Sequence, residues 1–148
     1  MTVYWIWFAL LKGISLHVKR QLLETFRDPE EIFLAESRAF PKEIAEALEE
    51  KDLTMASQIC SQCSREGIGI LTYGDAAYPD ALRNIEDPPL VLYYKGVLPD
   101  WNRQPLIGVV GTRRASAYGL TAAKRMGYQI AKCGGIVVSG MAFGIDSM

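Results

Sequence analysis

The chain has 148 residues, of which 49% are hydrophobic and 22% are charged. This composition is typical of a folded globular protein and excludes a disordered one. The longest apolar run, Val3–Leu11, has nine residues, far fewer than the roughly 20 that span a bilayer. It also lacks the basic start and the small-residue cleavage site of a signal peptide. Three cysteines do not make a disulfide framework, so we expect a cytoplasmic protein without a membrane partner.

Charge is distributed unevenly along the chain. Residues 1–100 carry 10 Lys and Arg against 16 Asp and Glu, whereas residues 101–148 carry six against one. One interpretation is that the carboxy-terminal third attracts a polyanion. The other is that an acidic helical face stands beside a neutral α/β core. Charge alone does not separate the two.

The first half of the chain is predicted to form short helices. Val3–Leu11 is apolar on nearly every side, which predicts a buried first helix. Ser15 is a cap for a second helix, and Asp28-Pro29 has the N-cap and first-turn residues of a third. Two more helices are predicted at Pro41–Leu48 and from Asp52 to Gly67, where glycine is a suitable C-cap.

The second half changes period and predicts strands. Ile68–Thr72 and Leu90–Lys95 are short strands bounded by turn residues. Leu106–Val110 is wholly apolar, which predicts a strand buried on both faces of a sheet. A helix at Ala117–Lys132 and a strand at Ile136–Val138 follow it, so these three elements predict a parallel βαβ unit.

Two polar turns leave this predicted unit at one edge of its sheet. Gly111-Thr112-Arg113 follows the first strand, and Ser139-Gly140 follows the second. Glycine N–H groups and hydroxyls can approach an oxyanion closely, and arginine can hold a phosphate with two hydrogen bonds. Ligands of open α/β sheets bind at this edge. We therefore predict a phosphate-binding notch with Arg113 as its cation, the alternative being ordinary turn chemistry. Neither a G-x-G-x-x-G fingerprint nor a P-loop is present.

Several short motifs of the chain resemble those of one known family. Val109–Arg113, Tyr118-Gly119 and Ser139–Asp146 resemble the V-G-[ST]-R, Y-G and S-G-x-A-x-G-I-D motifs of the DprA (Smf) family of DNA-processing proteins. Tyr78–Pro89 and Leu92–Gly96 resemble its Y-P-x-x-L, D-P-P and L-Y-x-K-G motifs. The resemblance covers roughly residues 68–146, in order, and is looser over the first 60 residues.

The resemblance implies an α/β fold in two domains. Residues 1–66 correspond to a small all-helical SAM-like (helix-hairpin-helix-like) domain, and residues 67–148 to the start of a Rossmann-like parallel α/β domain. The acidic surroundings of Leu11–Ile14 favour a plain helical turn there over a DNA-gripping hairpin. The family signature continues past Asp146 to a histidine, so we expect a Rossmann-like domain that is truncated after Met148.

The resemblance also implies a function. It is binding and protection of single-stranded DNA and loading of the RecA recombinase in natural transformation, DNA uptake and recombination. It implies no enzyme activity, no catalytic residue, no cofactor and no metal. The partners are single-stranded DNA, RecA and a second copy, although the dimer and RecA surfaces are expected beyond residue 148. The implied DNA-binding and phosphate-binding residues are Gly111, Thr112, Arg113, Ser139, Gly140 and Gly144.

Two alternatives to this function stay open. One is a Rossmann-like nucleotide-binding enzyme or sensor related to the phosphoribohydrolases, although their P-G-G-x-G-T-x-x-E segment does not occur in these 148 residues. The other is an inactive truncated remnant. A mobility-shift titration at several salt concentrations separates all three.

Other conspicuous residues have simpler interpretations. Cys60 and Cys63 form a C-x-x-C without a second pair, which favours packing over metal binding. Trp5, Trp7 and Phe8 crowd one segment, which favours the core of the first helix over a stacking platform for bases. Asp146 is expected to cap a helix or to accept a hydrogen bond from a glycine turn rather than to act as a catalytic acid.

Overall fold

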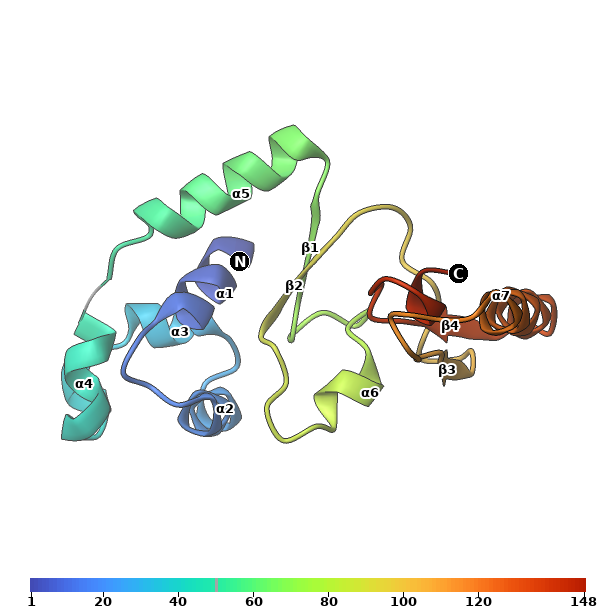
Figure 1. The fold of residues 1–148 in the computed structure, drawn as a ribbon. Coiled ribbons are helices and arrows are strands. Elements are labelled where there is room, and N and C mark those ends of the chain that lie inside the picture. The colour runs from blue at the N-terminus through green and yellow to red at the C-terminus, as the bar shows by residue number, and fades with distance from the viewer. Residues whose placement is uncertain (50) are drawn as a thin grey trace. The chain divides into compact units, whose positions relative to one another are not determined.

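The computed structural model describes residues 1–49 and 51–148, and the chain divides into two compact units, Met1–Gly96 and Val97–Met148 (Figure 1). The fold mixes helices with short strands. None of the helices in the described ranges combines the length and the apolarity that crossing a bilayer needs.

The first unit begins with the helices that the sequence predicts. Local hydrogen bonds set their starts: the Ser15 hydroxyl accepts the Val18 N–H at 3.3 Å, and the Asp28 carboxylate accepts the Glu30 N–H at 2.8 Å. Gly67 ends the last helix with a left-handed φ of 63°. The helices are α1 (Thr2–Leu10), α2 (Leu16–Thr25), α3 (Pro29–Leu34), the 3-10 helix η1 (Ser37–Ala39), α4 (Lys42–Glu49) and α5 (Thr54–Glu66).

Helix α1 forms the centre of this unit, between α3 and α5 in Figure 1. Trp5, Trp7 and Phe8 are all buried, and Phe8 has no exposed surface. The core interpretation of these aromatic residues is therefore confirmed. Phe8 shares the core with Ile32 and Leu48, one from α3 and one from α4. Burying each such side chain contributes about 2 kcal/mol to stability.

The buried Lys19, on α2, caps the C-terminal end of α1. The Lys19 ammonium donates hydrogen bonds to the carbonyl oxygens of Ala9 at 3.0 Å and Leu11 at 2.9 Å, and it lies 5.8 Å from the centre of the Phe8 ring. These carbonyls are the ones that the last turn of a helix leaves without partners. Burial lowers the pKa of Lys19 to about 8, because a low-dielectric surrounding disfavours the charged form.

An antiparallel strand pair completes the first unit. Strand β1 (Gly69–Thr72) pairs with β2 (Val91–Tyr94), so that Gly69 lies opposite Tyr94. The short helix α6 (Asp80–Arg83) lies in the connection between them. The strand pair contacts α1, and β1 also contacts α5, so it belongs to the same compact unit as the helices. The predicted domain boundary between residues 66 and 67 stays a prediction.

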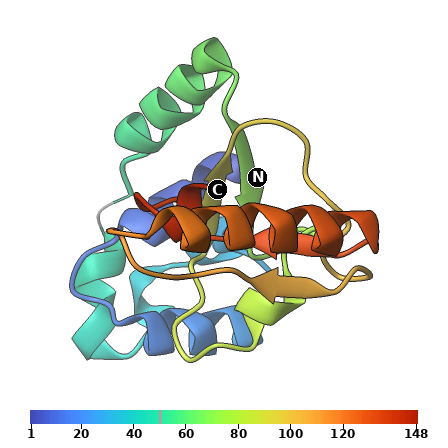
Figure 2. The same cartoon turned by 45° about the vertical axis from the view of Figure 1, so that its right-hand side comes forward.

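The second unit is a βαβ arrangement, as predicted. Strand β3 (Leu106–Gly108) pairs in parallel with β4 (Ile136–Val138), and α7 (Ala117–Lys132) connects them. Helix α7 lies along the strand pair in Figure 2, and the 3-10 helix η2 (Ile145–Ser147) follows β4.

The prediction that the first strand of this unit runs to Val110 and is buried on both faces is wrong. Strand β3 ends at Gly108, and 37% of Leu106 and 39% of Ile107 are exposed. The apolar run suits burial between two layers. In the described part of the second unit, α7 is the only long helix on the pair, so the strands are not enclosed on both faces.

Candidate nucleic-acid interface

The two predicted phosphate-binding turns leave the strand pair at the same end. In the parallel register, Gly108 lies opposite Val138, so the segments after β3 and β4 start side by side. The Val109 N–H extends the pairing by one hydrogen bond to the Val138 carbonyl oxygen at 2.9 Å. We call residues 109–116 and 139–144 the paired loops.

Gly144 brings the backbones of the paired loops together. Its φ of 92° and ψ of −126° lie in a region that essentially only glycine adopts. A Cβ at this position would overlap the Thr112 carbonyl oxygen and lie 2.9 Å from the Arg113 Cα. Next to it, the Ile145 N–H donates to the same Thr112 oxygen at 3.3 Å. Only glycine permits this close approach.

Asp146 connects the paired loops, with its side chain bonded to Gly111 and its backbone carbonyl bonded to Ser139. Its Oδ1 accepts a hydrogen bond from the Gly111 N–H at 2.9 Å, which confirms the expected bond to a glycine turn. The neighbouring Ile145 side chain lies where a Cβ of Gly111 would be, at 2.7 Å. A Cβ on Gly140 would lie 3.3 Å from Asp146 Oδ2. The Gly111 N–H that was predicted to approach an oxyanion thus already holds a carboxylate.

The two hydroxyls of the predicted notch have different roles. Ser139 Oγ donates to the Asp146 carbonyl oxygen at 2.6 Å and accepts the Met141 N–H at 3.1 Å, so its one O–H donor already has an internal partner. Thr112 Oγ1 accepts the Arg114 N–H at 3.2 Å. Because that bond uses only a lone pair, the Thr112 O–H can still donate to a ligand.

Arg113 is one of two exposed cations of the paired loops, beside Arg114, and it is the one that the sequence predicts to hold a phosphate. Within residues 1–49 and 51–148, its guanidinium has neither a hydrogen-bond nor an ion-pair partner. The second unit as a whole carries six Lys and Arg against Asp100 and Asp146. Such a surface attracts polyanions. Arg113 thus offers its full five-donor fork to a ligand.

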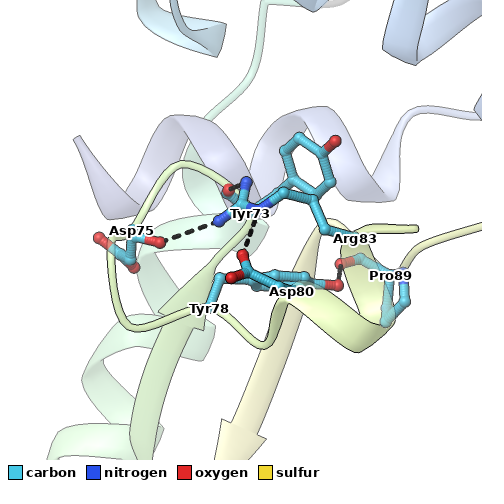
Figure 3. Close-up of polar contacts among 6 residues, drawn as sticks. All are labelled: Tyr73, Asp75, Tyr78, Asp80, Arg83 and Pro89. Carbon is cyan, nitrogen blue, oxygen red and sulfur yellow. Dashed lines mark hydrogen bonds and ion pairs between the residues drawn. The ribbon is translucent and has the colours of Figure 1, made fainter. Parts of the chain in front are cut away.

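The motif stretch between β1 and β2 forms a separate cluster around Arg83 (Figure 3). Its guanidinium donates to the carbonyl oxygens of Tyr73 and Asp75 and lies 3.6 Å from the Asp80 carboxylate. It also stacks against the rings of Tyr73 and Tyr78, with 4.7 and 5.0 Å to the ring centres. These contacts join Arg83 to residues on both sides of the turn, so its side chain holds the turn together.

Tyr78 anchors the same cluster from below, as Figure 3 shows. It is fully buried, and its hydroxyl donates to the Pro89 carbonyl oxygen at 2.7 Å. Burial raises the pKa of Tyr78, because the phenolate would lose its hydration. Asp75 in turn accepts hydrogen bonds from the N–H and the hydroxyl of Thr72, at 2.7 and 2.8 Å. Tyr78 of the Y-P motif and Pro89 of the D-P-P motif are thus joined by a buried hydrogen bond.

The cysteine pair lies on α5. Cys63 is buried and Cys60 is half-buried, and burial raises the pKa of the Cys60 thiol. The described residues contain no group of three or more His, Cys, Asp or Glu that is arranged to hold a metal ion. His17, the only histidine of the sequence, is exposed on α2.

Comparison with known proteins identifies the family. The model of the family described as DNA recombination-mediator protein A matches residues 69–148, more than half of the chain. The chain belongs to this family. The matched residues contain the paired loops and the Arg83 cluster, whereas helices α1 to α5 lie before the match.

Relatives of this DNA recombination-mediator family extend the similarity to the whole chain. The DNA processing protein DprA of Bacillus subtilis is 39% identical over 83 residues, which are 56% of this chain and 28% of that protein. Protein Smf of Synechocystis is 31% identical over 154 aligned residues, covering 97% of this chain and 39% of that protein. The X-ray structure of DprA from Streptococcus pneumoniae matches with a TM-score of 0.66 and 25% identity, over 99% of this chain and 52% of that one. The chain spans about half or less of each of these proteins.

Proposed function

We propose that this chain binds the sugar-phosphate backbone of single-stranded DNA at the paired loops, as part of a recombination mediator and not as an enzyme. One observation carries the proposal: the Arg113 guanidinium is exposed and without a partner among the described residues, on loops whose backbones are tightly connected. A rigid position lowers the entropy that a cation loses when it binds a phosphate. The family description supports the recombination role.

The surroundings of Arg113 suit a single strand. The Thr112 hydroxyl can add a second donor to a phosphate oxygen, while Ser139, Gly140 and Gly144 shape the loops and Gly111 binds Asp146. Two aromatic side chains of the same unit, Tyr118 and Phe143, are 84% and 85% exposed. Unpaired bases stack on such side chains, whereas bases within a duplex are not accessible to them.

Fluorescence anisotropy with a labelled oligo-dT at several salt concentrations tests the proposal. We expect affinity to fall steeply with salt, because bound phosphates release counterions. Arg113→Ala should weaken binding about tenfold and reduce the slope of log affinity against log salt by about 0.7. Arg103→Ala is the matched control, because Arg103 lies in the same unit and faces Asp100 at 3.8 Å. Equal effects of the two substitutions would contradict the proposal.

A mononucleotide that binds more tightly than the oligonucleotide would instead support the nucleotide-binding enzyme or sensor. RecA loading and dimer formation belong to the same proposal for the full-length protein, and they rest on the family membership. The measurement is whether the full-length protein speeds RecA filament formation on DNA that is covered by a single-strand-binding protein. An unchanged rate would contradict the loading role.

A further inference from the structure

The position that the Gly111 N–H offers to an anion is occupied by a side chain of the same molecule. Asp146 Oδ1 lies 2.9 Å from the Gly111 nitrogen, which is the distance of a charge-assisted hydrogen bond. A phosphate oxygen at this nitrogen would have to take the same place. Carboxylate and phosphate therefore compete for one donor.

The carboxylate is held there from several directions. The Asp146 carbonyl oxygen accepts the Ser139 hydroxyl at 2.6 Å, which connects the backbone of η2 to the loop after β4. The adjacent Ile145 packs against Gly111 and lies 3.4 Å from where a Cβ of Gly119 would be. Asp146 itself is half-buried. These contacts place its charge beside Gly111 before any ligand arrives.

We propose that Asp146 is a specificity-determining residue that competes with phosphate at the Gly111 N–H and so favours phosphodiesters over phosphomonoesters. This inference rests on the proposed binding of single-stranded DNA. A phosphomonoester carries a charge of about −1.5 to −2 at pH 7, whereas each backbone phosphodiester carries −1. Repulsion by a fixed carboxylate grows with the charge of the ligand. A single free phosphate group is therefore disfavoured most.

A strand of DNA does not need the Gly111 N–H. Its phosphates can bind the exposed Arg113 guanidinium and the O–H of Thr112, whose oxygen accepts the Arg114 N–H but whose hydrogen can still be donated. Several phosphates along one strand also reach the other cations of the unit, such as the exposed Lys124 and Arg125 on α7. The Asp146 carboxylate therefore lowers the affinity for a DNA strand less than it lowers the affinity for a mononucleotide or for inorganic phosphate.

Titration of the ¹⁵N-labelled 148-residue chain with inorganic phosphate tests the inference at the Gly111 amide resonance. Asp146→Asn removes the charge but keeps an oxygen that accepts the Gly111 N–H, so the loops stay connected. We expect it to raise the affinity for inorganic phosphate about tenfold and the affinity for oligo-dT only about threefold. Asp146→Ala should expose the Gly111 N–H outright and give the largest shift of its resonance.

Asp100→Asn is the control, because it removes the same charge from the same unit outside the paired loops. Equal gains from Asp100→Asn and Asp146→Asn would overturn the inference, and so would a phosphate affinity that Asp146→Asn leaves unchanged. If Asp146→Ala fails to fold, Asp146→Asn still decides. The result is separate from the proposed function: a wild-type chain that does not bind oligo-dT contradicts DNA binding, whereas the phosphate titration decides the role of Asp146.

Discussion

Replacing Gly144 by alanine should open the paired loops. The new Cβ would overlap the Thr112 carbonyl oxygen and come within 2.9 Å of the Arg113 backbone. Backbone atoms cannot turn aside as a flexible side chain can, so one loop must move away from the other. In the proposed function Gly144 shapes the loops and does not itself hold a phosphate, yet we expect its replacement to weaken both stability and DNA binding.

The magnitude follows from two effects. An alanine held at φ 92° and ψ −126° is strained by about 1–3 kcal/mol. Separation of the loops also lengthens the 3.3 Å hydrogen bond from the Ile145 N–H to Thr112, which contributes about 1 kcal/mol. We therefore expect Gly144→Ala to destabilise the second unit by about 2–4 kcal/mol.

Hydrogen exchange of amides in the second unit is the suitable assay, because it reports the opening of this unit separately from the first. The Val109 N–H, which bonds to Val138, is one probe of the strand pair. Gly127→Ala is the matched control: Gly127 lies inside α7, and a Cβ there meets open space. It should stabilise the helix by about 0.8–1 kcal/mol.

Two results would refute this reasoning. One is a Gly144→Ala variant with wild-type exchange rates, which would mean that the loops accommodate a side chain without separating. The other is a loss of protection in Gly127→Ala as large as in Gly144→Ala, which would mean that any added methyl group disturbs the unit. Loss of stability with unchanged oligo-dT affinity would instead contradict the position of the DNA site at the paired loops.

Three further predictions concern stability. Tyr78→Phe should lower the free energy of unfolding by about 1–3 kcal/mol, because it leaves the Pro89 carbonyl without its hydrogen bond. Urea denaturation checks this. The control is Tyr118→Phe, at an 84% exposed position, which should leave the free energy of unfolding unchanged. Lys19 has a pKa of about 8 in the folded chain and 10.5 when unfolded. Between these two pH values the unfolded chain binds more protons than the folded chain. The free energy of unfolding should therefore rise with pH, by up to about 3 kcal/mol. Lys19→Met should remove this rise, and parallel pH profiles of the two proteins would contradict the assignment. Ser116→Ala removes the N-cap of α7 and should cost about 1 kcal/mol, measured by amide exchange in the first turn of α7; unchanged exchange there would show that the cap contributes nothing.

The sequence by itself determined the local structure. Ser15, Asp28 and Gly67 set the ends of their helices through hydrogen bonds or backbone angles within a few residues, and the structure confirms each of them. The order of strand, helix and strand over residues 106–138 also predicted the parallel βαβ unit that is observed. These features depend on short-range rules, which act on neighbouring residues whatever the rest of the chain does.

Only the tertiary structure decided which hydrogen-bond partners the residues of the candidate site have. The sequence predicted that Gly111 and Ser139 would face a phosphate, but the structure engages both with Asp146, which is 35 residues from Gly111. It also showed that the Arg113 side chain is exposed, and that the apolar strand β3 is not enclosed on both faces. Contacts between distant residues have no periodic pattern in a sequence. Whether a donor binds a ligand or an internal carboxylate depends on which loops the fold brings within about 3 Å of each other.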